Sequence, residues 1–266
     1  GKLYIHKDVS RILKGTDMWL LKNESKKYVE IEHRRLKKKF KIPKSSLLYA
    51  MRRFSGINVI NVTKKADYII VDDFPQIEEY LSLSFGQKID KNFLKPWKKY
   101  VSNLTGNLLL ANHVNVSAPR TTILAYYSSQ PIVVPRSMWS IRLPDEPAKI
   151  LALWLNSSLG LLQMLMLRRE TEGAYLWFVA STLRKFLIPN LDVLSKEDFK
   201  RLLEIFEEKS KIEFPSLLDQ LKNKFSAKIE IDRTFLRIFG FNKNEIEEIL
   251  AFLYPALANE IEQLKA

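Results

Sequence analysis

The hydrophobic and polar positions of this chain change their spacing along its length. Before Pro144, short apolar runs alternate with turn-forming residues, and such runs predict β-strands. Several prolines stand at the edges of these runs, where a missing N–H does no harm to a sheet. We predict strands at residues 28–32, 57–62 and 68–71, and a β-meander over residues 107–143 with strands at 108–110, 121–127, 132–134 and 138–143.

Helical patterns interrupt and then follow these strands. We predict a helix start at residues 43–48 and a helix at residues 77–83, and we interpret residues 85–100 as irregular and basic. Residues 147–167 are the most apolar part of the chain. A membrane-spanning helix needs about 20 unbroken apolar residues, and polar residues such as Asn156 interrupt this stretch. The pattern therefore predicts a buried pair of core helices.

After Ser195 the apolar residues recur at the spacing of amphipathic helices. Ser195 is a candidate N-cap, with Asp198 at the third helical position. Further helices are predicted at about residues 215–226, 244–253 and 256–264, with Gly240 as a C-cap between them. We predict an α+β fold with a β-rich domain and core helices over residues 1–190, followed by a small helical module over residues 191–266.

The charge of the chain is unevenly placed. The 43 Lys+Arg against 30 Asp+Glu give a net charge of +13, and an apolar fraction of 46% excludes disordered and collagen-like classes. Residues 1–100 hold 23 basic and 11 acidic residues, residues 101–190 hold 8 and 4, and residues 191–266 hold 12 and 15. This polarity is typical of a polyanion-binding surface followed by a packing module.

Basic residues gather in short clusters, several of them beside an aromatic ring. In the densest cluster, residues 33–41, we expect Leu36, Phe40 and Ile42 to anchor the segment. The candidates for phosphate contacts are Arg34, Arg35, Lys37, Lys38, Lys39, Arg52, Arg53, Lys98 and Lys99. The candidates for reading bases are Arg120, Arg136, Arg168 and Arg169. The rings that could stack on bases are Phe54, Trp97, Tyr100, Tyr175 and Trp177. The alternative, that each cluster is a solvated surface, stays open.

The chain lacks the residues that several kinds of catalysis require. The chain has no cysteine, three widely spaced histidines and 8 glycines, with neither a dinucleotide-binding nor a phosphate-binding glycine loop. There is no Asn-Pro-Pro-aromatic tetrapeptide, and we interpret Asp72-Asp73 as a strand end. Asp145-Glu146 with Lys149 matches the nuclease spacing Glu-x-Lys poorly, so we interpret it as an acidic helix start. We predict a binding module with no catalytic residue and no metal site.

One stretch resembles a known family. Residues 151–160, LALWLNSSLG, resemble the Leu-x-x-Leu-Asn-Ser segment in the C-terminal part of N(6)-adenine DNA methyltransferases, which include TaqI-like enzymes and fused restriction-modification proteins. Residues 181–189, STLRKFLIP, resemble the family's Leu-x-x-Leu-x-Ile-Pro strand, and residues 131–143 resemble the strand before the Leu-Asn-Ser helix. Ile231-Asp232 with residues 241–253 resembles the closing region. Type I specificity subunits carry similar pieces. We expect Asn156 and its serines to satisfy backbone groups at a helix junction rather than touch DNA.

The resemblance implies a target recognition domain. In that family this domain reads double-stranded DNA, while a separate N-terminal domain binds S-adenosylmethionine and methylates an adenine flipped into it. We therefore expect no cofactor in this chain, with S-adenosylmethionine in the parent protein, and DNA and the methyltransferase domain as partners. Gly1 in place of an initiator Met indicates an excised piece, and no signal segment is seen, so we expect a cytoplasmic protein and no membrane. The abundant lysine and missing cysteine favour a thermophilic source.

Other functions stay open at this point. The parent could also cleave DNA, or the chain could be a specificity subunit that acts with a separate methyltransferase chain. An RNA-binding or scaffold module is a third possibility, which competition between duplex DNA and duplex RNA would distinguish.

Overall fold

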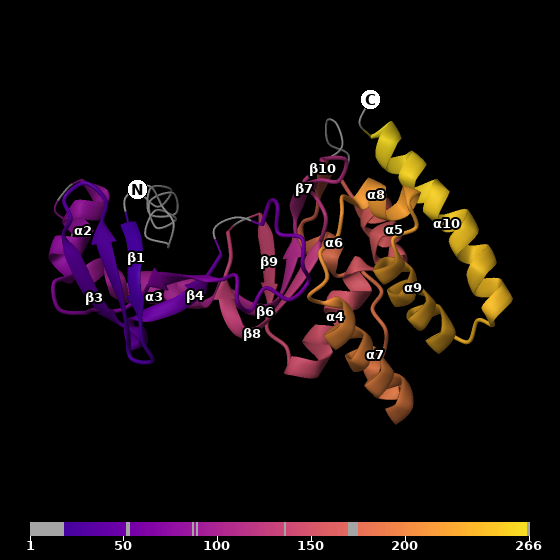
Figure 1. Ribbon diagram of the computed structural model, residues 1–266, viewed down its shortest axis with the longest axis horizontal. Coiled ribbons are helices and arrows are strands. Elements are labelled where there is room, and N and C mark those ends of the chain that lie inside the picture. The colour runs from indigo at the N-terminus through magenta and orange to yellow at the C-terminus, as the bar shows by residue number, and fades with distance from the viewer. Residues whose placement is uncertain are drawn as a thin grey trace. The chain divides into compact units, whose positions relative to one another are not determined.

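The computed structural model describes residues 19–51, 54–86, 88, 90–135, 137–169 and 175–264 (Figure 1). Its contacts divide the chain into two compact units. Unit 1 comprises the described residues within Gly1–Arg53, Lys65–Gly106 and Gln130–Pro135. Unit 2 comprises the described residues within Phe54–Lys64, Asn107–Ser129 and Arg136–Ala266. Each unit is thus built from segments that are far apart in the sequence.

Unit 1 contains an antiparallel sheet of order β1-β2-β3 and a second group of strands in which β4 pairs antiparallel with β5. The end of β8 (Ala125–Val133) pairs parallel with β4, through Tyr49 opposite Ile132. The elements are β1 (Trp19–Glu24), β2 (Tyr28–His33), β3 (Lys39–Pro43), η1 (Lys44–Ser46), β4 (Leu47–Ala50), β5 (Asp67–Ile70), α2 (Ile77–Phe85), η2 (Lys91–Phe93) and α3 (Leu94–Ser102).

Aromatic residues form the core of unit 1. The ring centroid of Trp19 lies 4.9 Å from that of Tyr80 and 5.5 Å from that of Phe40, and the three side chains are almost fully buried. Burying a side chain of this size contributes about 2–3 kcal/mol. Because Phe40 and Ile42 alternate with exposed lysines on β3, the strand is fixed by one face and presents its charges on the other.

Unit 2 combines strands with a helical layer. In it β6 pairs antiparallel with β9 and also neighbours β8, and β7 pairs antiparallel with β10. The remaining elements are β6 (Thr105–Ala111), β7 (His113–Asn115), β8 (Ala125–Val133), β9 (Met138–Ile141), α4 (Asp145–Asn156), α5 (Ser158–Leu167), β10 (Tyr175–Trp177), α6 (Ala180–Leu183), η3 (Leu191–Val193), α7 (Lys196–Lys209), α8 (Leu217–Lys222), α9 (Ser226–Ile238) and α10 (Lys243–Gln263).

The pair α4 and α5 forms the centre of unit 2. From Ile150 to Asn156 every residue of α4 is buried, and Ser157 both ends α4 and caps α5 by accepting a hydrogen bond from the N–H of Gly160 at 3.0 Å. A Cβ at Gly160 would stand 2.4 Å from the carbonyl oxygen of Trp154. The sharp bend between the two helices therefore requires glycine at this position.

Much of the predicted architecture is confirmed. The fold is α+β, residues 147–167 belong to a helix pair, Tyr28–His33 is a strand, and Ser195 caps α7 by accepting from the N–H of Asp198 at 3.0 Å. Gly240 follows α9 with a φ of 92°, as a C-terminal glycine should. Acidic residues begin α4 directly after Pro144, as predicted for Asp145-Glu146.

Other predicted elements are wrong. Residues 43–48 form one 3-10 turn and then β4, because Leu47 pairs with Ile70 of β5. In residues 57–62 the structure has only an isolated bridge, Asn61 to Tyr127. Residues 107–143 do not form a meander, since β7 leaves to pair with β10. The segment after Leu183 that resembles a family strand has no strand in the part of the chain that the structure describes.

Three helices also differ from the prediction. Residues 85–100, predicted to be irregular, contain most of α3, whose Leu94, Trp97 and Val101 recur on one buried face among lysines. Helix α9 was not predicted as a separate element. The two predicted C-terminal helices are one helix, α10, which continues through Pro255. Pro255 is exposed, so water can reach the carbonyl group that its ring leaves without an N–H donor.

The predicted domain boundary after Asn190 stays a prediction. Contacts within unit 2 join residues before and after it, such as α4 with α7 and α5 with α10. Among the described residues no single helix is long and apolar enough to cross a bilayer, and α4 with α5 reaches that length only as a pair bent by 70°.

Candidate nucleic-acid interface

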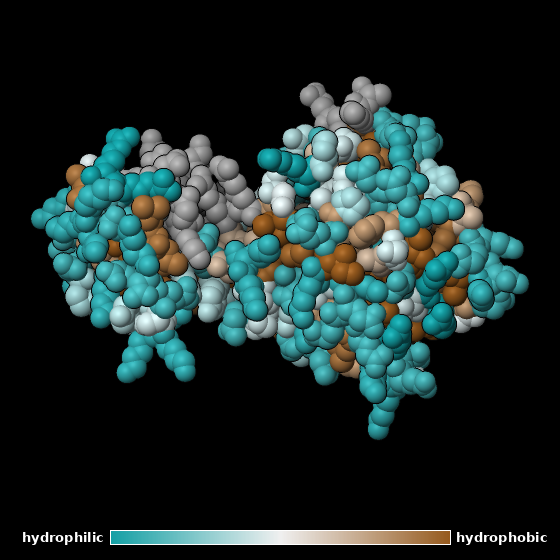
Figure 2. Space-filling view, in the orientation of Figure 1, coloured by the Kyte–Doolittle hydropathy of each residue, from teal (hydrophilic) through white to brown (hydrophobic). Residues whose placement is uncertain are grey.

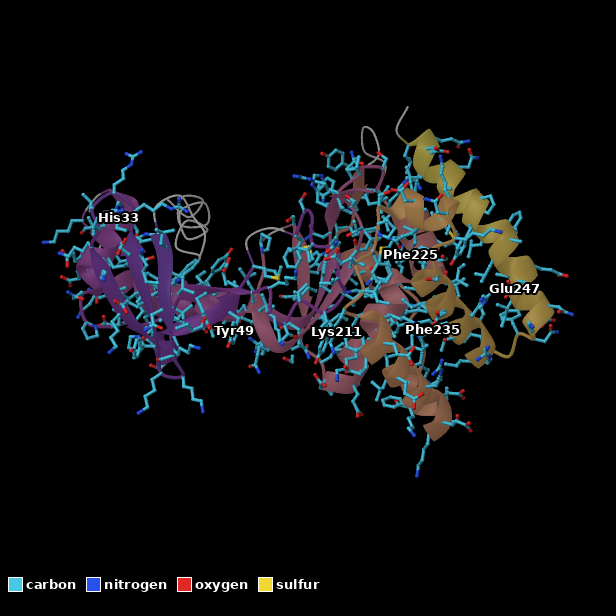
Figure 3. The ribbon with its side chains drawn as sticks, viewed as in Figure 1. His33, Tyr49, Lys211, Phe225, Phe235 and Glu247 are labelled. Carbon is cyan, nitrogen blue, oxygen red and sulfur yellow. The ribbon has the colours of Figure 1, made fainter. Side chains whose placement is uncertain are left out.

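A tight turn between β2 and β3 carries the densest basic cluster. His33 closes the turn, because its carbonyl accepts the N–H of Lys37 at 2.9 Å and its N–H donates to the carbonyl of Lys38 at 2.8 Å. The ring Nδ1 of His33 also accepts the N–H of Leu36 at 3.1 Å. Lys37 has a φ of 56°, so the backbone here takes the left-handed conformation that reverses the chain. His33 itself is buried edge-on against Trp19, which fixes the turn to the core. Figure 3 labels His33 in unit 1.

We call the turn and the first residue of β3 the basic hairpin; its cations are Arg34, Arg35, Lys37, Lys38 and Lys39. All five are exposed. Lys38 forms an ion pair with Glu79 of α2, and no ion pair joins the other four to a carboxylate among the described residues. Hydrophilic side chains cover most of the face of unit 1 that Figure 2 shows. The hairpin therefore holds several unneutralised positive charges on a rigid base.

One expected anchor of this segment is wrong. Phe40 and Ile42 are each 1% exposed and anchor β3, but Leu36 is 59% exposed at the tip of the turn. The turn places Leu36 between its arginines and lysines, away from the aromatic core of unit 1. Its side chain therefore belongs to the exposed surface of the basic hairpin.

The second predicted cluster lies on α3. Lys98 and Lys99 are both exposed, and Lys98 forms an ion pair with Asp72, which follows β5. The hydrogen bond from Lys98 lowers the pKa of Asp72. Trp97 does not stack outward: it is buried, and its indole N–H donates to the carbonyl of Ile70 at 3.0 Å. Of these two lysines, Lys99 alone is therefore without a carboxylate partner in the described residues.

The candidates for base reading divide into different environments. Arg120 is exposed in a loop of unit 2. Arg168 is half-buried at the end of α5, where it donates to the carbonyl of Leu165 at 2.5 Å and pairs with Glu260 at 2.9 Å. These contacts give Arg168 a structural role. Arg136, the other base-reading candidate named from the sequence besides Arg169, lies outside the described residues, as do Arg52 and Arg53, which were candidates for phosphate contacts.

The two-stranded ribbon of β7 and β10 brings His113 close to Arg169, Tyr175 and Trp177, which are distant from it in the sequence. The guanidinium carbon of Arg169 lies 5.9 Å from the ring centroid of Trp177, and Trp177 is 45% exposed. His113 stacks on Tyr175 with ring centroids 5.0 Å apart. His113 was not predicted to join this site; its signal was the alternation His113-Val114-Asn115 opposite Tyr175-Leu176-Trp177.

Of the other two rings named from the sequence, Phe54 packs on Tyr126 with centroids 4.9 Å apart, whereas Tyr100 is 39% exposed. Phe54 therefore belongs to the packing of unit 2 and not to a stacking surface.

The Leu-Asn-Ser segment is a structural junction, as expected. The Asn156 side-chain oxygen accepts the N–H groups of Leu124 and Ala125 at 2.9 and 3.2 Å. Its amide nitrogen donates to the carbonyls of Ala125 and Ala152 at 2.6 and 2.8 Å. One side chain thus joins the end of α4 to the start of β8, with every hydrogen-bonding group in use.

The second segment of the family resemblance, which contains Asp232, contacts this junction. Asp232 of α9 is buried and accepts hydrogen bonds from the N–H and hydroxyl of Ser158 at 2.7 and 2.6 Å and from the hydroxyl of Tyr254 at 2.7 Å. Lys228 donates to the carbonyl of Asn156 at 2.8 Å. Burial lowers the pKa of Lys228, and the carboxylate of Asp232 opposes that shift. The two motifs are therefore parts of one polar cluster in the core of unit 2.

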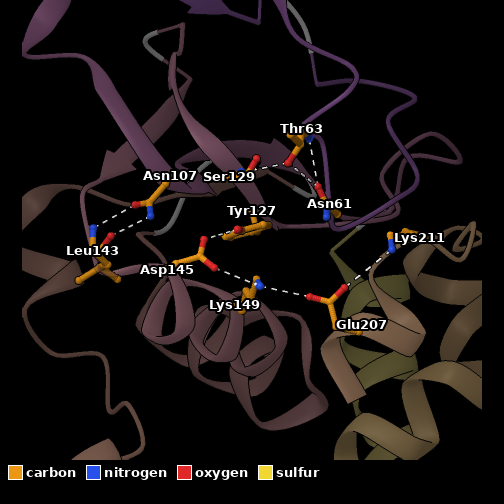
Figure 4. A network of polar contacts seen from close by, with 10 residues as sticks. All are labelled: Asn61, Thr63, Asn107, Tyr127, Ser129, Leu143, Asp145, Lys149, Glu207 and Lys211. Atoms are coloured by element: carbon orange, nitrogen blue, oxygen red, sulfur yellow. Dashed lines mark hydrogen bonds and ion pairs between the residues drawn. The ribbon is translucent and has the colours of Figure 1, made fainter. Parts of the chain in front are cut away.

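A second polar network covers the start of α4 (Figure 4). Asp145 accepts a hydrogen bond from the hydroxyl of Tyr127 and pairs with Lys149 at 3.1 Å, and Lys149 also pairs with Glu207 of α7 at 3.1 Å. Partial burial pushes the pKa of Asp145 upward, but the bonds from Tyr127 and Lys149 outweigh it and lower the pKa. These groups are paired with one another, which fits a structural link between β8, α4 and α7. Among the described residues no three His, Asp or Glu side chains gather as a metal site requires.

Comparisons with known proteins add one relationship. No protein-family model matches the sequence, and no curated protein matches it. Among solved structures, the type IIG restriction endonuclease BpuSI is similar, with a TM-score of 0.63 and 14% sequence identity. The match covers 84% of this chain and 27% of that chain. The chain is therefore similar in fold to a segment of that enzyme. At this level of identity the likeness concerns the fold alone, and this chain spans about a quarter of the length of BpuSI.

Proposed function

We propose that this chain is a sequence-specific DNA-binding domain, the target recognition part of a restriction-modification protein. The observation that carries the proposal is the fold, which is similar over 84% of the chain to a segment of a type IIG restriction endonuclease. The finer assignment, to a TaqI-like adenine methyltransferase, rests on the resemblance of the Leu-Asn-Ser and Ile-Asp segments. The contact between Ser158 and Asp232 supports it, because both segments then serve one structural purpose.

The basic hairpin supplies the proposed contacts to DNA. Duplex DNA carries one negative charge per about 1.7 Å of its axis, so exposed cations on a rigid turn can lie opposite several phosphates. Arg34, Arg35, Lys37 and Lys39 suit this role better than Lys38 and Lys98, because the latter two already contact carboxylates. Phosphate contacts position the protein, and base contacts would come from other exposed groups such as Arg120 and Arg169.

The proposal assigns no catalysis to this chain. Methyl transfer would belong to a separate S-adenosylmethionine domain of the parent protein, or to a separate chain if this one acts as a specificity subunit. Isothermal titration with S-adenosylmethionine should give no saturable heat, and clear binding in the micromolar range would contradict this part of the proposal.

Salt dependence tests the proposed DNA contacts. Fluorescence anisotropy of the whole chain with a labelled duplex should show affinity falling steeply as salt rises. The slope of log affinity against log salt is about −0.9 per phosphate neutralised. Replacing Arg34, Arg35, Lys37 and Lys39 by Gln should therefore flatten that slope by about 3 to 4 units. Lys196→Gln with Lys200→Gln is the control, since it neutralises two exposed lysines at the start of α7 and should leave the slope unchanged.

Three outcomes would count against parts of the proposal. An unchanged slope in the hairpin variant would remove the basic hairpin from the interface. Selection from a random duplex library should enrich one sequence motif, and failure to enrich any motif would contradict sequence-specific recognition. Duplex RNA of matched length that competes as well as DNA would favour the RNA-binding alternative.

A further inference from the structure

We propose that the outer face of the β7–β10 ribbon is a stacking platform for an unstacked nucleobase. This inference rests on the proposed function, since the base would belong to the nucleic acid that the chain binds. Strands β7 and β10 lie side by side in unit 2 (Figure 1), with Trp177 opposite His113 and Tyr175 opposite Asn115. The platform is defined by His113, Tyr175, Trp177 and Arg169.

The two faces of the ribbon differ completely. Leu176, between the two aromatic residues of β10, is 0% exposed and points into the core. Tyr175 and Trp177 are 43% and 45% exposed on the opposite face. Because side chains alternate along a strand, Leu176 points into the core while Tyr175 and Trp177 point to the surface. The sheet thus fixes aromatic side chains on the surface of unit 2.

The rings and the guanidinium have defined mutual positions. The His113 and Tyr175 rings are nearly parallel, with an angle of 17°, whereas the Trp177 ring stands at 83° to His113. Arg169 is fixed beside them, because its backbone N–H donates to the carbonyl of Trp177 at 3.3 Å. Arg168 is paired with Glu260, but Arg169 has no carboxylate partner among the described residues. The platform therefore carries a positive charge that nothing described neutralises.

This combination suits a nucleobase. Stacking of a base on an aromatic side chain is worth about 1–3 kcal/mol and tolerates every base, because all bases have a π-face. An arginine over the ring adds a cation–π contact and a charge for the adjoining phosphate. Bases inside a paired duplex already stack on their neighbours, so the ligand is a base that is unpaired or flipped out of the helix.

The experiment compares two duplexes with the whole chain. One is fully paired, and the other has a single bulged 2-aminopurine, whose fluorescence falls when it stacks. We expect the chain to bind the bulged duplex about tenfold more tightly and to quench its fluorescence, since tenfold corresponds to about 1.4 kcal/mol. Trp177→Ala should remove both the preference and the quenching, while leaving the affinity for the paired duplex within about twofold and the salt slope unchanged.

Two variants keep the test specific. Trp177→Phe should retain most of the preference, because the ring is kept. Phe252→Ala removes an aromatic side chain that is 78% exposed on α10 and should behave like the unmodified chain. Each variant is compared by thermal unfolding, so that a loss of fold is recognised.

The outcomes separate the two proposals. Salt-dependent binding of both duplexes with no preference for the bulge, or a preference that survives in folded Trp177→Ala, overturns the platform alone. The same result is expected if a polypeptide partner covers this face. Absence of salt-dependent binding to either duplex overturns the proposed function and the platform together.

Discussion

The two units hold nearly equal numbers of basic residues but different numbers of acidic ones. The sequence ranges of unit 1 carry 22 Lys+Arg against 11 Asp+Glu, whereas those of unit 2 carry 21 against 19. In unit 2, cations such as Lys149, Lys209 and Arg233 each pair with carboxylates on neighbouring helices. In unit 1 four of the five cations of the basic hairpin have no ion pair with a carboxylate among the residues that the structure describes. A lysine or arginine therefore indicates binding only where the fold leaves it without a carboxylate partner.

The two units also differ in how their cores are stabilised. Unit 1 fixes its basic surface with an aromatic core around Trp19, while unit 2 depends on buried polar junctions at Asn156 and Asp232. Disruption of a junction should thus affect stability, and neutralisation of the hairpin should affect binding. Four predictions test this division, from the largest expected effect to the smallest.

Asn156→Ala should destabilise unit 2 by about 3 kcal/mol, because it leaves buried N–H and carbonyl groups of β8 and α4 without partners. Urea unfolding followed by circular dichroism measures this loss. Asn103→Ala is the control, since Asn103 is exposed and only its backbone N–H makes a described bond. Equal stability of the two variants would show that the junction does not support unit 2.

Asp232→Asn should cost about 2–3 kcal/mol, because an amide cannot accept all three hydrogen bonds from Ser158 and Tyr254. Tyr254→Phe removes only one of these bonds and should cost about 1 kcal/mol. Thermal unfolding of the two variants gives the order. If Tyr254→Phe lost as much stability as Asp232→Asn, the stabilisation would come from the tyrosine and not from the carboxylate.

Glu79→Gln should strengthen binding to duplex DNA by about two- to fivefold at low salt, because it releases Lys38 and removes a negative charge beside the hairpin. The difference should shrink as salt rises. Glu78→Gln, an exposed neighbour on α2, measures the effect of charge alone. If both variants gain equally, the release of Lys38 contributes nothing.

Asp145→Asn should change the acid dependence of stability by a small amount. The folded state lowers the pKa of Asp145 below its ordinary 3.8, so its contribution is present above that pH and is lost as pH falls through the lower, folded value. The variant should therefore lose less stability than the unmodified chain below about pH 3.8. Thermal unfolding across this range measures it, with Glu146→Gln as the neighbouring control. Parallel curves for both would contradict the role of the Tyr127–Asp145–Lys149 contacts.

The sequence by itself determined the α+β class, the buried helix pair and the basic character of the first part of the chain. These features follow from local spacing and composition, such as the alternation over residues 28–32, which form most of β2, and the Ser195 cap of α7. It also located Arg169, Tyr175 and Trp177 as candidate binding residues, because basic and aromatic residues there are neighbours in the chain.

Only the tertiary structure decided which of these groups remain available. Pairing with Glu79, Asp72 and Glu260 occupies Lys38, Lys98 and Arg168, and these partners come from 26 to 92 residues away in the sequence. His113 joins Tyr175 for the same reason: the alternation in each segment indicates a strand, but only the tertiary structure decides that these two strands pair. Local patterns specify which side chains a helix or strand presents. Long-range packing specifies which partners those side chains contact, and whether a charged side chain is available for binding depends on these partners.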